Sequence, residues 1–258
     1  MELIQLTPVH LVWALGLIVF AIGLSAWEKL GLEWRLLVAT GRTIVQLVGV
    51  GFFLEVIFAW KNPWAVLGVL GLMLTVAAMV ARNRIGKKIP QILPIVWGSL
   101  LVSTALTIIY VNLLVLQPPS WYEPQYLIPL AGIVLGNAMN GGAIAGERLA
   151  STLSSARLEI ETHLSLGATP QQAVASSRKE AIRAGMIPTL NSMMIVGVVT
   201  LPGILTGQLL SGVNPFTAAF YQMLILFMLA CATLIATLLV TQGICLKVFN
   251  AADQLMNW

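Results

Sequence analysis

The chain has 258 residues, of which 58% are hydrophobic and only 9% charged, with a formal net charge of +4. An ordinary soluble domain has roughly 25% charged residues, so this composition excludes a soluble globular protein and predicts an integral membrane protein. The two cysteines, Cys231 and Cys245, lie in or beside the last apolar segment. They indicate neither a disulfide framework nor a zinc site.

Seven apolar segments meet the requirement of about 20 residues for a helix that crosses a bilayer. We therefore expect an all-α protein with about seven transmembrane helices, forming one transmembrane domain over residues 1–258. The segments are 8–27, 42–60, 63–81, 91–116, 127–146, 188–211 and 216–242.

The basic residues predict the orientation, because Lys and Arg accumulate on the cytoplasmic side of a membrane protein. With the N-terminus outside and the C-terminus in the cytoplasm, every one of the 14 basic residues except Lys61 lies inside. The inside clusters are 29–42, 82–88 and 147–187, followed by Lys247. We expect a multi-pass protein of the cell (inner) membrane.

The cytoplasmic region 147–187 contains the signals of two helices joined by a sharp bend. Helix 127–146 is expected to continue to about residue 166, where Gly167 provides a left-handed C-terminal cap. Thr169 and Gln172 then form a capping box that starts a second helix, running to about Met186. The expected apex consists of Leu166, Gly167, Ala168, Thr169 and Pro170.

Two interpretations of this elbow remain open. The second helix is amphipathic, and Arg178, Lys179 and Arg183 on its polar side fit a helix that lies on anionic lipid. A docking elbow for a cytoplasmic partner protein is favoured by the small, apolar apex. Because both helices of the elbow continue into membrane segments, a force on the apex would move those segments. In the docking interpretation Arg178 and Arg183 also belong to the contact surface.

The chain contains no nucleotide-binding motif. No GxxxxGK[ST] phosphate loop occurs, since Gly86-Lys87 lacks both the earlier glycine and the hydroxyl residue. No H-E-x-x-H, GxSxG or Cys/His cluster occurs either. We expect no catalysis by this chain, and ATP with magnesium would act only through a partner.

Four motifs together resemble those of the FetB-type permeases, the membrane subunits of iron-export ABC transporters, a family that also includes plant aluminium-sensitivity permeases. The motifs are "GNAM" (136–139), "LSLGATPQQA" (164–173), "RKEAIRAGMIPT" (178–189) and "VTLPGILTGQLLSGVNP" (199–215). The resemblance implies that the elbow is the coupling helix, inserted into a groove on a separate ATPase subunit. It also implies a metal cation such as iron as the exported substrate. A half-transporter with one elbow would most simply act as a two-fold homodimer with two ATPases.

Polar groups within spanning segments are the candidate lining of the transport pathway, because they are costly in lipid unless they face a cavity or a partner. Glu55, the acidic residue within a span, is either a cation ligand near the exit or a carboxylate that reaches outer water. The other candidates equally fit helix packing, through interhelical amide bonds and methionine as core filler. They are Gln46, Asn137, Met139, Asn140, Asn191, Met193 and Met194.

The segment 188–211 is expected to be broken, because Pro202 and Gly203 stand together at membrane depth. Proline removes one backbone hydrogen bond, and such breaks occur where protein or a water-filled cavity satisfies the freed carbonyls. We expect one helix to about Thr200, a short helix to about Leu210, and a hinge at Pro202 and Gly203.

Two other functions remain as alternatives at this point. One is an ABC permease for an organic substrate, such as a nucleotide sugar. The other is a secondary transporter that works without an ATPase. A retinal protein is disfavoured, since segment 216–242 contains no lysine.

Overall fold

The computed structural model describes residues 8–60, 62–86, 89, 91–250 and 254–256, and every named element among them is a helix. In this part of the chain, six helices are long and apolar enough to cross a membrane. They are Val9–Trp27, Glu33–Trp60, Pro63–Ile85, Ile92–Leu116, Pro124–Ser155 and Pro215–Val248. The predicted class, an all-helical multi-pass membrane protein, is confirmed. The expected span 188–211 is not a seventh continuous helix.

The chain divides into two compact units, and the first consists of residues 1–61 with 210–212. It contains α1 (Pro8–Trp27) and α2 (Glu33–Trp60). Gly31, with φ of +68°, reverses the chain between them, and the Ser25 hydroxyl donates to Glu33 Oε1 at 2.7 Å. The helix α2 therefore begins well before the expected residue 42. A carboxylate at a helix N-terminus is favourable, which explains this early start.

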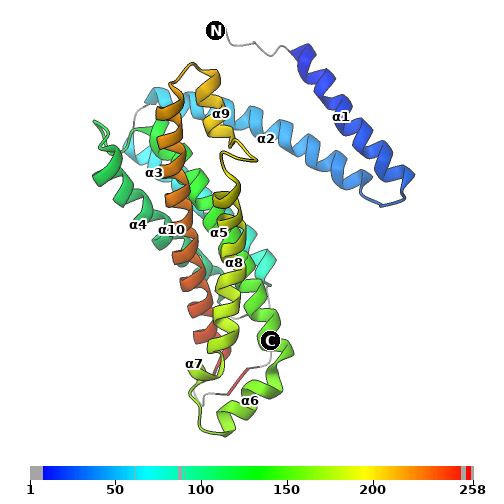
Figure 1. Cartoon of the computed structure of the whole chain (residues 1–258), viewed down its shortest axis with the longest axis vertical. Helices are drawn as coiled ribbons and strands as arrows, with labels where there is room; N and C mark the ends of the chain where they lie inside the picture. The colour runs from blue at the N-terminus through cyan, green and yellow to red at the C-terminus, as the bar shows by residue number, and fades with distance from the viewer. Residues whose placement is uncertain (1–7, 61, 87–88, 90, 251–253, 257–258) are drawn as a thin grey trace. The chain divides into compact units, whose positions relative to one another are not determined.

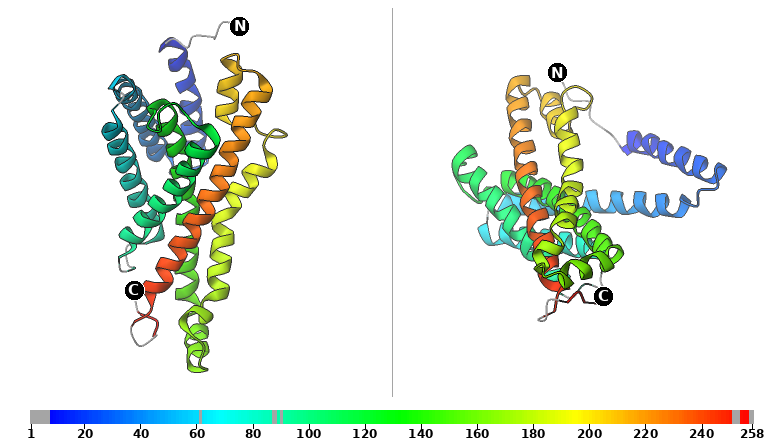
Figure 2. Two further views of the ribbon diagram at one scale, coloured as in Figure 1. Left: turned by 90° about the vertical axis from the view of Figure 1, so that its left-hand side faces the viewer. Right: turned by 60° about the horizontal axis from the view of Figure 1, so that its bottom comes forward.

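The second unit consists of residues 62–209 and 213–258 and contains the other helices. Its centre is α5, which packs against α3, α4, α8 and α10 (Figures 1 and 2). The elements are α3 (Pro63–Ile85), α4 (Ile92–Tyr110), a π-helix (Val111–Leu116), α5 (Pro124–Ser155), α6 (Arg157–Ser165), α7 (Pro170–Ala173), α8 (Ala175–Ile195), α9 (Gly203–Leu210) and α10 (Pro215–Val248). The prediction of one domain over the whole chain stays a prediction.

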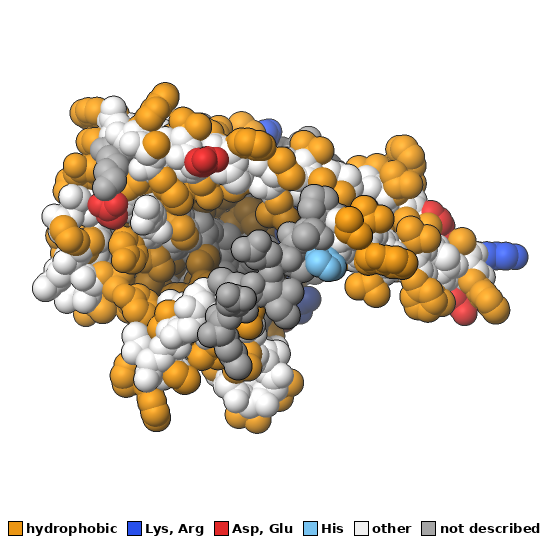
Figure 3. Space-filling model, turned by 90° about the horizontal axis from the view of Figure 1, so that it is seen from above, with side chains coloured by type: hydrophobic (Ala, Val, Ile, Leu, Met, Phe, Trp, Pro, Cys, Tyr) orange, Lys and Arg blue, Asp and Glu red, His pale blue; other side chains and the backbone are white. Residues whose placement is uncertain are grey.

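The second unit has two chemically different ends. The helices α6 and α7 lie at the end where α10 finishes, whereas α9 lies at the opposite end (Figures 1 and 2). Three ion pairs gather near α6 and α7, and Figure 3, seen from the α9 end, shows mainly hydrophobic and uncharged side chains. Such segregation of charge is expected for a cytoplasmic α6 end, and the predicted orientation relies on it.

Small residues allow the central helices of this unit to pack closely. A Cβ atom added to Gly146 on α5 would lie 2.7 Å from Ile85 Cδ1 and 3.2 Å from Val240 Cγ1. One added to Gly142 would lie 3.4 Å from Val240 Cγ2. The glycine pair therefore serves helix packing between α3, α5 and α10, as small residues do in membrane helices.

The expected break in segment 188–211 is confirmed, although it occurs earlier in the chain than predicted. The helix α8 ends at Ile195, before the expected Thr200, and α9 begins at Gly203. Gly197 has φ of +79° and donates its N–H to the Thr200 carbonyl at 2.9 Å. Because a positive φ cannot continue a right-handed helix, α8 has to end before Gly197.

The start of α8 also differs from the prediction. We expected one helix to end near Met186 and the membrane segment to begin at residue 188. The structure has one helix through Pro188, which lies inside α8. Packing of α8 against α5 and α10 accounts for this continuity, since neighbouring helices compensate for the one backbone bond that a proline removes.

Candidate functional site

The apex between α6 and α7 has the backbone geometry that the sequence predicted. The expected single helix from residue 127 to about residue 166 is wrong, because Ala156, with ψ of 21°, interrupts it between α5 and α6. Gly167 has φ of +90°. Its N–H donates to the Leu164 carbonyl at 3.0 Å, and the Ala168 N–H donates to the His163 carbonyl at 3.0 Å. These two bonds are the Schellman arrangement, which satisfies the free carbonyls at the end of a helix. The left-handed cap at Gly167 is thereby confirmed.

The second half of the elbow begins with the predicted capping box. The Thr169 hydroxyl accepts from the Gln172 N–H at 3.3 Å, and the Thr169 N–H donates to Gln172 Oε1 at 2.9 Å. Pro170 occupies the first turn. The helix that follows is interrupted once, at Val174, which separates α7 from α8. The elbow therefore has a defined shape on both sides of its apex.

The apex presents an apolar side chain to its surroundings. Leu166 is 80% exposed, and Ala168 is partly exposed beside it. Leu158, near the start of α6, is 81% exposed and was not among our candidates. Its signal in the sequence was a leucine among the polar residues of "RLEIETHLS" (157–165). Exposed leucines on a polar helix are suited to burial against another protein.

Two ion pairs join the helices that flank the elbow. Arg84 Nε on α3 bonds Glu147 Oε2 on α5 at 3.2 Å. Arg148 on α5 forms an ion pair with Glu180 on α8. The first bond joins α3 to α5, and the second joins α5 to α8. The two helices on either side of the elbow, α5 and α8, are therefore linked to each other.

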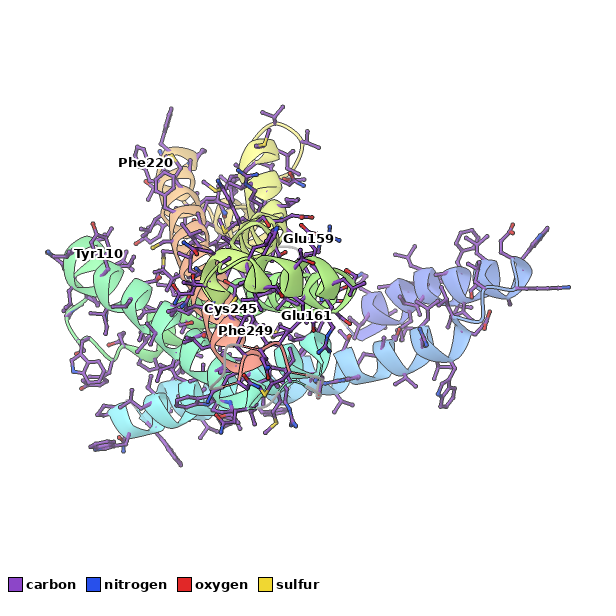
Figure 4. The ribbon with its side chains drawn as sticks, turned by 90° about the horizontal axis from the view of Figure 1, so that it is seen from below. Tyr110, Glu159, Glu161, Phe220, Cys245 and Phe249 are labelled. Atoms are coloured by element: carbon purple, nitrogen blue, oxygen red, sulfur yellow. The ribbon has the colours of Figure 1, made fainter. Side chains whose placement is uncertain are left out.

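Leu255, near the C-terminus, lies close to α6. Arg157 Nη2 donates to the Leu255 carbonyl at 3.1 Å, and Leu255 itself is 5% exposed. Figure 4 labels Glu159 and Glu161 on α6 and Phe249, the residue after α10. A cavity of about 720 Å³ remains between α6, the apex and Leu255. The segment that follows α10 thus supports the elbow through Leu255.

The helix after the elbow turns its apolar stripe inward. Ala173, Val174, Ala181 and Gly185 are buried, and α8 packs against α5 and α10. Of the basic residues, Arg183 is exposed, whereas Arg178 lies against α10. Arg178 donates from Nε to Thr241 Oγ1 and from Nη2 to the Leu238 carbonyl, both at 3.3 Å. An amphipathic helix lying on lipid would present its apolar stripe to the membrane, so this inward packing favours the docking interpretation.

The candidate pathway residues of α5 and α8 lie in different environments. Asn137 donates to the Ile133 carbonyl of its own helix at 3.0 Å, and Asn140 is exposed. On α8, Asn191 is exposed and Met194 is 79% exposed. Two methionines, Met139 and Met193, pack against the hydrophobic core. The exposed amides are consequently the polar groups available to line a pathway.

The remaining candidates belong to the other compact unit of the chain. Gln46 and Glu55 lie on α2 in the first unit, and both are exposed. Among the described residues, no group of three or more His, Cys, Asp and Glu side chains is placed to hold a metal ion. The role of Glu55 as a metal ligand stays a prediction.

The proposed hinge residues, Pro202 and Gly203, lie at the start of α9. The Pro202 carbonyl accepts from the Thr206 N–H at 3.0 Å, and Gly203 is the first residue of α9. Pro202 thus caps the short helix, and the turn at Gly197 forms the other side of the break. The sequence prediction placed the break only at the proline, because a glycine that takes positive φ has no distinct local signal there.

Together, the fold and the elbow define a multi-pass helical membrane protein with a capped elbow between its helices α5 and α8. The chain belongs to UPF0014, a family described as uncharacterised, whose model matches residues 8–249. The UPF0014 membrane protein slr1647 of Synechocystis is 51% identical over 254 residues, or 98% of each chain. No solved structure matches the chain significantly.

Two further relatives carry descriptive names. The probable iron export permease protein FetB of Escherichia coli is 34% identical over 252 residues, covering 98% of this chain and 96% of FetB. The protein ALUMINUM SENSITIVE 3 of Arabidopsis thaliana is 32% identical over 245 residues, covering 95% of this chain and 88% of that protein. The resemblance stated from the four motifs is confirmed.

Proposed function

We propose that the chain is the permease subunit of an ABC transporter, in which the elbow docks into a separate cytoplasmic ATPase. The observation that carries this proposal is the elbow itself. Its two halves are capped on both sides of Gly167, its exposed Leu166 stands at the apex, and it lies between α8 and α5, a helix long and apolar enough to cross a membrane. A rigid elbow of this kind would pass a movement of the ATPase to α5 and α8.

In the same proposal two copies of the chain form a homodimer with two ATPases, which bind ATP and magnesium. One elbow for each chain supports this stoichiometry, since a two-fold dimer presents two equivalent docking sites. Export of a metal cation such as iron is proposed because of the similarity to FetB, which extends over nearly the full length of both chains. Asn140 of α5 and Asn191 of α8, the exposed amides of the second unit, are the proposed polar lining of the pathway.

A pull-down tests the docking elbow. Ala168→Glu places a charge at the apex, where it would be buried unpaired in the ATPase groove, so we expect loss of ATPase co-purification from detergent without anionic lipid. Ser154→Glu, at an exposed position near the end of α5, is the matched control and should retain the ATPase. Retention of the ATPase at wild-type levels by Ala168→Glu would show that the elbow does not dock.

Reconstitution tests the substrate. The permease–ATPase complex in vesicles should show ATPase stimulation and outward transport with ferrous iron. Other divalent metals and UDP-glucose are the comparison substrates. If UDP-glucose is the one compound that stimulates ATPase activity, the substrate is organic and the proposal of a metal is wrong. Transport by the permease without the ATPase would identify a secondary transporter.

A further inference from the structure

A small cavity lies between the start of α8 and the inner end of α10. Its volume is about 190 Å³, several times the roughly 30 Å³ that one water molecule occupies in the liquid. Its apolar wall includes Val174, Ile182 and Cys245, and its polar wall includes Arg178, Lys179 and Gln242. Figure 4 shows Cys245 on α10 beside the helices of the elbow region. The cavity therefore combines an apolar surface with two cationic groups.

The positive charge of this cavity has no carboxylate partner within the described part of the chain. Arg178 donates to two neutral groups, Thr241 Oγ1 and the Leu238 carbonyl. The ion pairs among the described residues join other basic residues to Glu147, Glu180 and Glu161. Glu180, next in sequence to Lys179, is already paired with Arg148. An anion in the cavity would thus gain charge-assisted hydrogen bonds without displacing an existing ion pair.

The position of the cavity identifies the kind of anion. Gln242 and Cys245 lie in the last turns of α10, a helix apolar enough to span the membrane, at the end that carries the elbow. We place these residues near the level at which the apolar interior of a bilayer meets its headgroups, because the basic residues Arg178, Lys179 and Lys247 gather around this end of the apolar helix. Basic pockets between membrane helices at that level on the cytoplasmic side bind lipid headgroups.

We propose that this cavity binds the phosphodiester headgroup of an anionic glycerophospholipid. The Arg178 guanidinium and the Lys179 ammonium contact the phosphate, and the amide of Gln242 bonds to headgroup hydroxyls. The first methylenes of an acyl chain pack on Val174 and Ile182. The lipid joins α8 to α10 immediately above the elbow. This assignment stands independently of the ATPase, because no part of it requires a docked partner.

Lipid-dependent thermal stability tests the proposal. The purified full chain is heated in detergent with added phosphatidylglycerol or phosphatidylcholine, and unfolding is followed by tryptophan fluorescence. We expect phosphatidylglycerol to raise the melting temperature by several degrees and phosphatidylcholine to leave it unchanged. Lys179→Gln should at least halve the shift. Lys247→Gln, which removes a cation of α10 outside the cavity, should retain it.

Arg178→Gln provides a second variant, with the shift measured from its own lipid-free melting temperature because Arg178 also bonds α10. We expect its phosphatidylglycerol shift to be lost. An unchanged shift in Lys179→Gln, or an equal reduction in Lys247→Gln, would overturn the proposal in favour of diffuse surface attraction. An equal rise with inorganic phosphate alone would overturn it in favour of a free anion.

Discussion

A Cβ atom added to Gly185 on α8 would lie 2.6 Å from the carbonyl oxygen of Gly141 on α5. The same atom would lie 2.8 Å from Thr237 Cγ2 on α10, so the helices α5, α8 and α10 meet at Gly185. The helices α5 and α8 also support the two halves of the elbow. In the proposed transporter, this close contact would pass a movement of the elbow to both helices together.

Gly185→Ala should destabilise the protein, because the nearest atom to the new methyl group is a backbone oxygen that cannot rotate away. Overpacking of this kind costs about 1 to 3 kcal/mol. We expect a lower melting temperature in detergent. Gly136→Ala on α5 is the control, since nothing lies within 4 Å of an added Cβ atom there. Equal melting temperatures for the two variants would contradict the close contact.

Gly167→Ala should weaken ATPase binding, because φ of +90° strains a residue that carries a Cβ atom by about 1 kcal/mol or more. Asparagine tolerates positive φ better than alanine, so Gly167→Asn should retain more of the ATPase in the same pull-down. The order wild type, Gly167→Asn, Gly167→Ala is the expected result. If Gly167→Ala retains as much ATPase as the wild type, the cap does not determine docking.

Glu55→Gln should reduce the stimulation of ATPase activity by metal, since the neutral amide is a weaker ligand for a hard cation than a carboxylate. Assembly and basal hydrolysis should be unchanged. The matched control is Glu28→Gln, at an exposed carboxylate in the turn after α1. Full metal stimulation in a folded Glu55→Gln complex would return this residue to the role of a solvated carboxylate.

Pro202→Ala should preserve or raise the melting temperature while slowing turnover. The substitution restores an N–H between the Gly197 turn and α9, so residues 196–202 gain access to helical conformations. A more helical segment would flex less during each transport cycle. The measurements are melting temperature and transport rate in reconstituted vesicles. Normal turnover would show that the break is architectural and does not act as a hinge.

Several features of this protein were determined by short stretches of the sequence. Apolar runs of bilayer length predicted the membrane class, and the cap at Gly167 with the Thr169–Gln172 box was correctly predicted. The physical reason is locality. A helix cap depends on hydrogen bonds between residues three to five positions apart, so the residue types near the bend are sufficient to predict it.

Other features were decided by tertiary packing. The continuation of α8 through Pro188 depends on its contacts with α5 and α10, and Arg178 finds its hydroxyl partner, Thr241, 63 positions further along the chain. Amphipathic periodicity showed that Ala173 and Ala181 share a stripe, yet it could not tell whether that stripe meets lipid or protein. Both environments are apolar, so the same residues satisfy either one, and only the neighbouring helices distinguish them.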